Sequence, residues 1–206
     1  MQKRNYQKEL ENVIESGFGN KVPRLLLHVC CAPCSSSVLE YLSKYFEITV
    51  FYYNPNIEPQ SEFDFRLAEE RRFVSEITPE HPVTVIAGEY ENSAYHDAVK
   101  GLENEPEGGK RCEKCFYMRL KKTALLCKKE NFDYFTTTLT VSPLKNADML
   151  NAIGERAASE TGARWLPCDF KKKNGYLRTI ELSKKHNLYR QNYCGCVYSR
   201  AGKSFD

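Results

Sequence analysis

Four short apolar runs alternate along this chain with longer amphipathic segments, and this alternation is its clearest structural signal. The runs cover residues 25–29, 48–53, 82–86 and 134–138, and polar or chain-breaking residues flank them, as expected of buried strands. Segments of helical periodicity cover residues 36–45, 61–77, 90–100, 113–131 and 146–160. Strands that alternate with helices form parallel sheets through right-handed crossovers. The pattern therefore predicts an α/β fold in which helices cover both faces of a parallel sheet.

Two segments lie outside this pattern, one at each end of the chain. Residues 1–21 indicate an N-terminal helical extension. The tail, about 167–206, is basic and rich in tyrosine, and one short helix is expected in it at 179–186. A chain of 206 residues with 41% apolar content can build one core without disulfide bonds. We expect residues 22–206 to form a single catalytic α/β domain that ends in a small C-terminal appendage.

The loops that follow the predicted strands carry the unusual residues. They cover residues 30–37, 54–59 and 140–145, after the first, second and fourth runs. Ligands of open parallel sheets bind beyond the carboxyl ends of the strands, where the strand order reverses. The loops therefore predict a site at that edge of the sheet.

The two halves of the chain differ strongly in charge. Residues 1–103 carry a net charge of −6 and residues 104–206 a net charge of +9. The basic half places groups of lysines among tyrosines, at Lys121, Lys122, Lys128, Lys129, Lys171, Lys172, Lys173, Lys184 and Lys185. Lysines neutralise the phosphates of a nucleic acid and aromatic rings stack on its bases, so this composition favours a polyanionic partner. The alternative is a solvated helix face with ordinary lysines.

The sequence predicts no membrane association. No stretch approaches the length of a membrane span, and the start of the chain lacks the apolar run of a secretory signal. We therefore expect a cytoplasmic, reducing compartment, where cysteines are available for metals or catalysis and are not tied up in structural disulfides.

Cysteine is the most informative residue type in this chain. Seven of its nine cysteines fall in three clusters, which are Cys30, Cys31 and Cys34; Cys112 and Cys115; and Cys194 and Cys196. A soft metal needs several thiolates at bonding distance from one centre, so clustered thiols indicate metal or redox chemistry. Of the other two, Cys127 lies among leucines on a predicted helix and is typical of a core residue. Cys168 has no assignment from its context.

Three kinds of centre fit the first two clusters. A dithiol redox centre fits Cys31-Ala32-Pro33-Cys34, which follows a strand and opens a helix as in thioredoxins, although Cys30 stands where thioredoxins carry tryptophan. A structural zinc site would use two cysteine pairs, although Cys112 and Cys115 begin a helix and adjacent cysteines suit a zinc knuckle poorly. An iron–sulphur cluster is a larger body, and it can take ligands from adjacent residues and from a remote helix. Its four thiolates would come from Cys30, Cys31, Cys112 and Cys115.

The third cluster and a nearby histidine have alternatives of their own. The two thiols that flank Gly195 can close a small, strained and readily reducible disulfide, or they can remain free near the end of the chain. His28 lies beside the cysteines on a buried strand, where a hydrogen-bonded core histidine is more common than a metal ligand.

Several strings taken together resemble the QueH family, the cobalamin-independent epoxyqueuosine reductases. They are HVCCAPCS at 28–35, YNPNI at 53–57, CEKCFYMRL at 112–120, TLTVSPLK at 138–145, DFKK at 169–172 and YRQNYCGC at 189–196. The resemblance covers about residues 22–200 and leaves residues 1–21 unexplained.

The resemblance implies a fold, a reaction and a set of site residues. The fold is Rossmann-like, of the adenine-nucleotide α-hydrolase type. The reaction is the reduction of epoxyqueuosine to queuosine at the wobble position of a tRNA anticodon, the last step of queuosine biosynthesis. By the family's pattern, Cys30, Cys31, Cys112 and Cys115 ligate a [4Fe-4S] cluster, and Cys194 and Cys196 form a redox-active disulfide. The alternatives are a zinc-stabilised RNA-binding module and a thioredoxin-like dithiol oxidoreductase.

Further residues complete the expected site. Removal of an epoxide oxygen as water takes two electrons and two protons, so we expect an external electron donor and an acid or an additional iron. ATP, nicotinamide and flavin have no motif in this chain. The candidates for the acid or iron ligand are Cys34, Asp169 and Glu62, although Glu62 also suits the start of a helix and Asp169 can pair with the adjacent lysines. The candidates for tRNA binding are Lys171, Lys172, Lys173, Lys121, Lys122 and Arg190.

Overall fold

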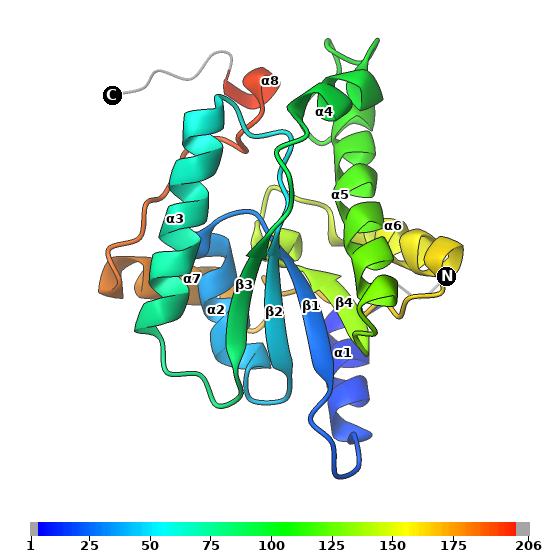
Figure 1. The fold of residues 1–206 in the computed structure, drawn as a ribbon, viewed down its shortest axis with the longest axis vertical. Helices are drawn as coiled ribbons and strands as arrows, with labels where there is room; N and C mark the ends of the chain where they lie inside the picture. The colour runs from blue at the N-terminus through cyan, green and yellow to red at the C-terminus, as the bar shows by residue number, and fades with distance from the viewer. Residues whose placement is uncertain (1–3, 201–206) are drawn as a thin grey trace.

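The computed structural model describes residues 4–200 and contains a four-stranded, all-parallel sheet in the order β3-β2-β1-β4 (Figure 1). The strands are β1 (Arg24–Val29), β2 (Glu47–Tyr52), β3 (Val83–Ala87) and β4 (Tyr134–Thr137). Each agrees with its predicted bounds to within one residue. β1 is a central strand that pairs with β2 and β4. Its side chains from Leu25 to Val29 are all buried, which agrees with the continuous apolar run of this strand. The prediction of a Rossmann-like α/β fold is confirmed.

Helices connect the strands and cover the sheet. They are α1 (Tyr6–Glu15), α2 (Ala32–Leu42), α3 (Gln60–Glu76), α4 (Asn92–Val99), α5 (Lys110–Lys129), α6 (Ala147–Thr161), α7 (Gly175–Lys185) and α8 (Val197–Arg200), with a short 3-10 helix η1 (Thr138–Val141) after β4. Because the strand order reverses after β3, right-handed crossovers place α2 and α3 on one face and α5 on the other. Figure 1 shows α3 and α5 extending beyond the carboxyl ends of the strands, on the left and right of the view.

Helix α2 begins four residues before its predicted start. Pro33 lies in its first turn, where a backbone N–H is not needed and where the fixed φ of proline suits a helix. Cys31 is therefore the N-cap residue, and Cys34 lies in the first turn. The early start places both thiols at the helix N-terminus, directly after β1.

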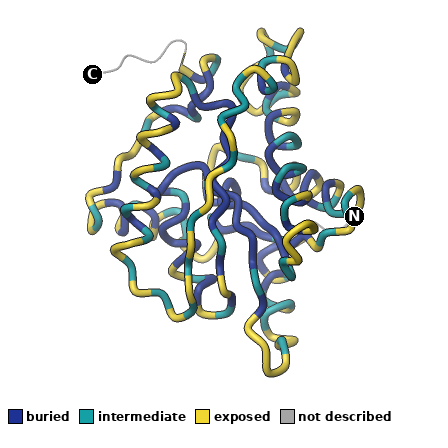
Figure 2. Tube along the Cα trace, viewed as in Figure 1, coloured by how far each residue is buried: buried dark blue, intermediate teal, exposed yellow. Residues whose placement is uncertain are grey.

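The two ends of the chain pack on the same body. Leu10 of α1 is fully buried in the main core, and Arg4 forms an ion pair with Glu155 of α6 (2.7 Å). Figure 2 shows β1, β2 and β4 at the buried centre of the molecule, whereas the edge strand β3 is only partly buried, contrary to the prediction of a buried strand there. The predicted tail contains α7 and α8, and its residues 201–206 lie outside the described part of the chain. Within residues 4–200, none of the helices combines the length and the apolar composition needed to cross a bilayer.

Candidate metal and redox site

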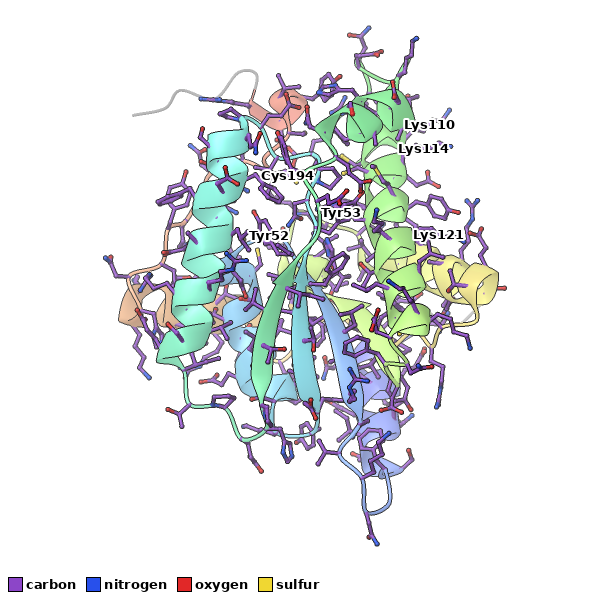
Figure 3. The ribbon with its side chains drawn as sticks, viewed as in Figure 1. Tyr52, Tyr53, Lys110, Lys114, Lys121 and Cys194 are labelled. Atoms are coloured by element: carbon purple, nitrogen blue, oxygen red, sulfur yellow. The ribbon has the colours of Figure 1, made fainter. Side chains whose placement is uncertain are left out.

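The seven clustered cysteines meet beyond the carboxyl ends of β1 and β4, where the strand order reverses. Cys30, Cys31 and Cys34 follow β1, and the segment 138–145 follows β4 on the neighbouring strand. Figure 3 shows Cys194 of the tail above the strands, between α3 and α5. This is the edge of the sheet at which the loops predicted a site.

The seven clustered cysteines line two adjoining cavities. The larger has a volume of about 290 Å³ and is lined by Cys30, Cys31 and Cys34, by residues 141–145 and by residues 190–194. The smaller and tighter one is lined by Cys112, Cys115, Cys194 and Cys196. Cys194 and Glu107 line both cavities, so the tail joins the first cysteine cluster to the second.

The thiols of the first cluster lie close enough to share one centre. The Sγ atoms of Cys30, Cys31 and Cys34 are all within 4.8 Å of one another, with Cys30–Cys31 at 3.8 Å and Cys31–Cys34 at 2.9 Å. Three soft donors in this arrangement can bind a metal centre. The nine cysteines are free thiols in this structure.

The three thiols differ in acidity. The pKa of Cys30 is lowered well below its usual value, because the thiols of Cys31 and Cys34 donate hydrogen bonds to its sulphur. The hydrogen bond to Cys30 raises the pKa of Cys31 to about 12, and the hydrogen bonds to Cys30 and Cys31 raise the pKa of Cys34 well above its usual value. Cys30 is therefore the first of the three to become a thiolate.

A buried arginine lies between the two cysteine groups. Arg119 of α5 is 1% exposed, and its Nη1 donates to Oδ1 of Asn54 (3.2 Å). The Nδ2 of Asn54 in turn donates to the carbonyl of Val29 (2.8 Å). Burial by itself lowers the pKa of Arg119, but the sulphurs of Cys115, Cys194 and Cys30 outweigh it and raise the pKa. The Nη2 atom of Arg119 is buried and has no protein partner. A fixed cation with an unused N–H fits an anionic group held between the cysteines.

Arg66 of α3 holds the tail cysteines in place. Its Nη1 donates to the carbonyl of Cys194 (3.3 Å), while Glu62 accepts from its Nε (2.7 Å). Gly195 has a φ of +120°, and a Cβ atom there would lie 2.8 Å from Ile57. The loop that carries Cys194 therefore needs glycine at this position, both for its backbone and for its fit against the Asn54–Pro59 segment.

The three candidates for an acid or an iron ligand occupy different surroundings. Cys34 lines the larger cavity. Asp169 pairs with Lys171 (2.7 Å) and lines a separate surface hollow. Glu62 lies in the first turn of α3, pairs with Arg66 and lines neither cavity. Cys34 is the member of this set that the structure brings into the cysteine site.

The candidate cations for tRNA are mostly engaged in ion pairs. Lys121 pairs with Glu160 (2.6 Å) and Lys122 with Glu91 (2.9 Å). Lys171 and Lys173 pair with Asp169 and Glu11, whereas Lys172 is exposed. Arg190 lines the larger cavity.

Two core assignments from the sequence are confirmed. His28 is fully buried, and its ring nitrogens contact Thr137 Oγ1 (2.9 Å) and the carbonyl of Tyr53 (3.1 Å). Burial lowers its pKa to about 3, so the ring is neutral and hydrogen-bonded. Cys127 is buried in the main core. Cys168 is fully buried too, and accepts hydrogen bonds from Thr136 and Thr140.

Glu70 of α3 is a buried carboxyl that the sequence did not single out. Its Oε2 accepts a hydrogen bond from Ser35 Oγ in the first turn of α2 (2.9 Å), and its Oε1 has no protein partner. Burial raises its pKa from 4.5 to about 8, so Glu70 is neutral in the folded protein at pH 7.

Glu70→Gln should flatten the pH dependence of stability. Between pH 4.5 and 8 the unfolded chain loses the Glu70 proton and the folded chain keeps it, so the free energy of unfolding falls as pH rises, by at most about 1.4 kcal/mol per pH unit. Urea unfolding of the metal-free protein from pH 5 to 8 measures this slope. The exposed Glu80→Gln serves as the control. Identical slopes for wild type and Glu70→Gln would contradict the assignment.

Comparison with known proteins decides the family. The profile of the epoxyqueuosine reductase QueH family matches residues 25–202. The chain belongs to the QueH family. Among its relatives, epoxyqueuosine reductase QueH of Streptococcus pyogenes serotype M1 is 42% identical over 208 residues, which cover 100% of this chain and 82% of the relative. The Staphylococcus epidermidis protein of the same name is 40% identical, over 100% of this chain and 88% of its own length.

More distant QueH proteins cover the body of the chain. That of Thermotoga maritima is 38% identical over 178 residues, 85% of this chain and 89% of the relative. The family resemblance predicted from the short strings is confirmed. Matches along the whole chain, as with the Streptococcus pyogenes QueH protein, include residues 1–21, which the resemblance had left unexplained.

Proposed function

We propose that this protein reduces epoxyqueuosine in tRNA to queuosine, removing the epoxide oxygen as water. The observation that carries the proposal is the convergence of seven thiols on two joined cavities, one of about 290 Å³, in a chain of the QueH family. The direct test is conversion of tRNA that contains epoxyqueuosine by the reduced, metal-loaded protein.

The donor set fits a [4Fe-4S] cluster. Cys30 and Cys31 would hold it from one side and Cys112 and Cys115 from the other, since the two groups lie in adjoining cavities. Arg119 and Lys145 face the sulphurs and supply positive charge for an anionic cluster. Cys34 is the candidate ligand for an additional iron. A bound cluster supplies electrons one at a time.

The residues around the larger cavity supply protons. An epoxide, two electrons and two protons give an alkene and one water, so two acidic hydrogens must reach the oxygen. Cys34 holds its proton because its pKa is raised, with the shared hydrogen bond to Cys30 as the main cause. Burial by itself lowers the pKa of Lys145, but the sulphurs of Cys194, Cys30 and Cys34 outweigh burial and raise the pKa above its usual value. This lysine is therefore a cation in the same cavity. A thiol and an ammonium therefore face the space that the epoxide would fill.

The electrons would arrive from an external donor through the tail. Cys194 lines both cavities, and Cys196 lies beside it in the smaller one. Oxidation of this dithiol to a disulfide releases two electrons and two protons, which equals the demand of one epoxide. The external donor would then reduce the disulfide again.

Neutralisation of tRNA phosphates should come from the basic half of the chain. Changing Lys171, Lys172 and Lys173 together to glutamine should weaken tRNA binding and reduce its salt dependence, by about one unit of slope for each phosphate that is no longer neutralised. Lys172→Gln alone should account for most of the effect, because Lys171 and Lys173 pair with Asp169 and Glu11. Binding titrations at several salt concentrations measure both quantities. An unchanged slope would assign the phosphates to Lys121 and Lys122.

A further inference from the structure

One turn separates the larger cysteine cavity from a broad surface hollow. The hollow, about 980 Å³, lies between α1, residues 143–148 and residues 169–173. The two spaces share Pro143, Leu144 and Lys145 and no other lining residue. These three residues form a ridge, with the cysteines on one side and α1 on the other.

The ridge is held rigidly by its own backbone. The N–H of Lys145 donates to the carbonyl of Ser142 (3.2 Å), and the N–H of Leu144 donates to Ser142 Oγ (3.3 Å). The N–H of Ser142 donates to the carbonyl of Leu139 in η1 (3.3 Å), and the ring of Pro143 fixes its φ. These contacts fix the backbone from which the Leu144 side chain projects.

Leu144 is exposed to an unusual degree for an aliphatic side chain. It is 77% exposed, the largest value among the big apolar residues in the described part of the chain. Cations lie on both sides of it, with Lys8 and Lys172 in the hollow and Arg190 at the cysteine cavity. Lys8 and Lys172 form no ion pair with any described residue, so they are available to phosphates. An exposed apolar side chain on a hydrogen-bonded turn between cations suits a nucleic acid that is bent or unstacked at that point.

We propose that Leu144 is a wedge that occupies the place of the wobble base when that base leaves the anticodon stack and enters the cysteine cavity. This inference rests on the proposed function. An enzyme that acts on a base must take the base out of the stack, and an apolar side chain that fills the gap offsets the loss of stacking. Lys145, the next residue, lies on the cavity side and would face the base that has entered.

The test uses cluster-loaded protein and an anticodon stem-loop with epoxyqueuosine at the wobble position and 2-aminopurine next to it. Binding of wild type should raise 2-aminopurine fluorescence, because the wedge separates the probe from its neighbour. Leu144→Ser should lose most of the rise and lower kcat/KM about tenfold, with unchanged iron content. Leu144→Met should retain both. Leu177→Ser removes another exposed leucine (55%), which is on α7 and lines neither the cavity nor the hollow, and should behave as wild type.

A full fluorescence rise and a normal rate in Leu144→Ser would overturn the wedge. Failure of the proposed reductase function would be visible in a different measurement, the conversion of the epoxide by wild-type protein. If wild type leaves the epoxide intact, the fluorescence of wild type and Leu144→Ser still shows whether Leu144 separates the bases.

Discussion

Serine in place of Cys30 or Cys115 is expected to abolish both iron binding and reduction. An alkoxide is a poor ligand for a soft metal, and loss of a direct ligand should exceed the roughly 10- to 100-fold effect of losing an outer hydrogen-bond partner. The two residues lie on opposite sides of the joined cavities, so each tests one half of the ligand set. Iron and sulphide per chain after anaerobic reconstitution, together with the visible absorbance, measure the outcome.

Two further variants sharpen this result. Cys127→Ser alters a buried cysteine of the core and should leave iron and sulphide unchanged. Cys34→Ser should keep the cluster and lose any additional iron, because Cys34 is outside the proposed set of four. A fully occupied cluster in Cys112→Ser or Cys115→Ser would contradict the set, and loss of the whole cluster in Cys34→Ser would require Cys34 as one of its ligands.

Cys194→Ser and Cys196→Ser should separate electron supply from metal binding. Each should retain iron and fail in multiple turnover, because the dithiol that stores two electrons for each epoxide is gone. Product formed per chain, followed over time with limiting enzyme, distinguishes one turnover from many. The effect on later turnovers should approach complete loss.

The position of the tail makes the result informative in either direction. Cys194 and Cys196 share a cavity with Cys112 and Cys115, so they are placed to exchange electrons with a cluster and equally to bind one. Loss of iron in Cys194→Ser would make this cysteine a ligand. Continued turnover at the wild-type rate would show that the pair is not needed as a redox couple.

The sequence predicted the sheet closely because the signal for it is local. The apolar run that contains Leu25, Leu26 and Leu27 fits a buried strand and little else. The run that forms β3 was also predicted as a buried strand, but β3 is at the edge of the sheet and is only partly buried. The start of α2 was predicted too late because proline usually interrupts helices, whereas Pro33 occupies the first turn. Cys30, Cys31 and Cys34 lie at the expected edge because they directly follow β1, and parallel strands bring the loops after them together at that edge.

The buried charged residues around the site could not be predicted from local sequence patterns. Arg119, Arg66 and Glu70 stand on long helices at positions that look like ordinary charged surface residues, yet all three are buried. Their burial depends on partners far away in sequence, such as Asn54 for Arg119 and the carbonyl of Cys194 for Arg66. Local periodicity carries no information about such pairings. The grouping of the tail cysteines with Cys112 and Cys115 likewise depends on the tertiary fold.

We expect the cysteine site to remove one oxygen atom from a modified base of tRNA. Mass spectrometry of nucleosides from tRNA bearing epoxyqueuosine tests it directly, after incubation with reduced, cluster-loaded protein and no added ATP, nicotinamide or cobalamin. We expect the modified nucleoside to lose the mass of one oxygen atom and become queuosine, and Cys30→Ser protein to leave it unchanged. An unchanged epoxide after incubation with wild-type protein that holds a full cluster and a strong reductant would rule out this reaction.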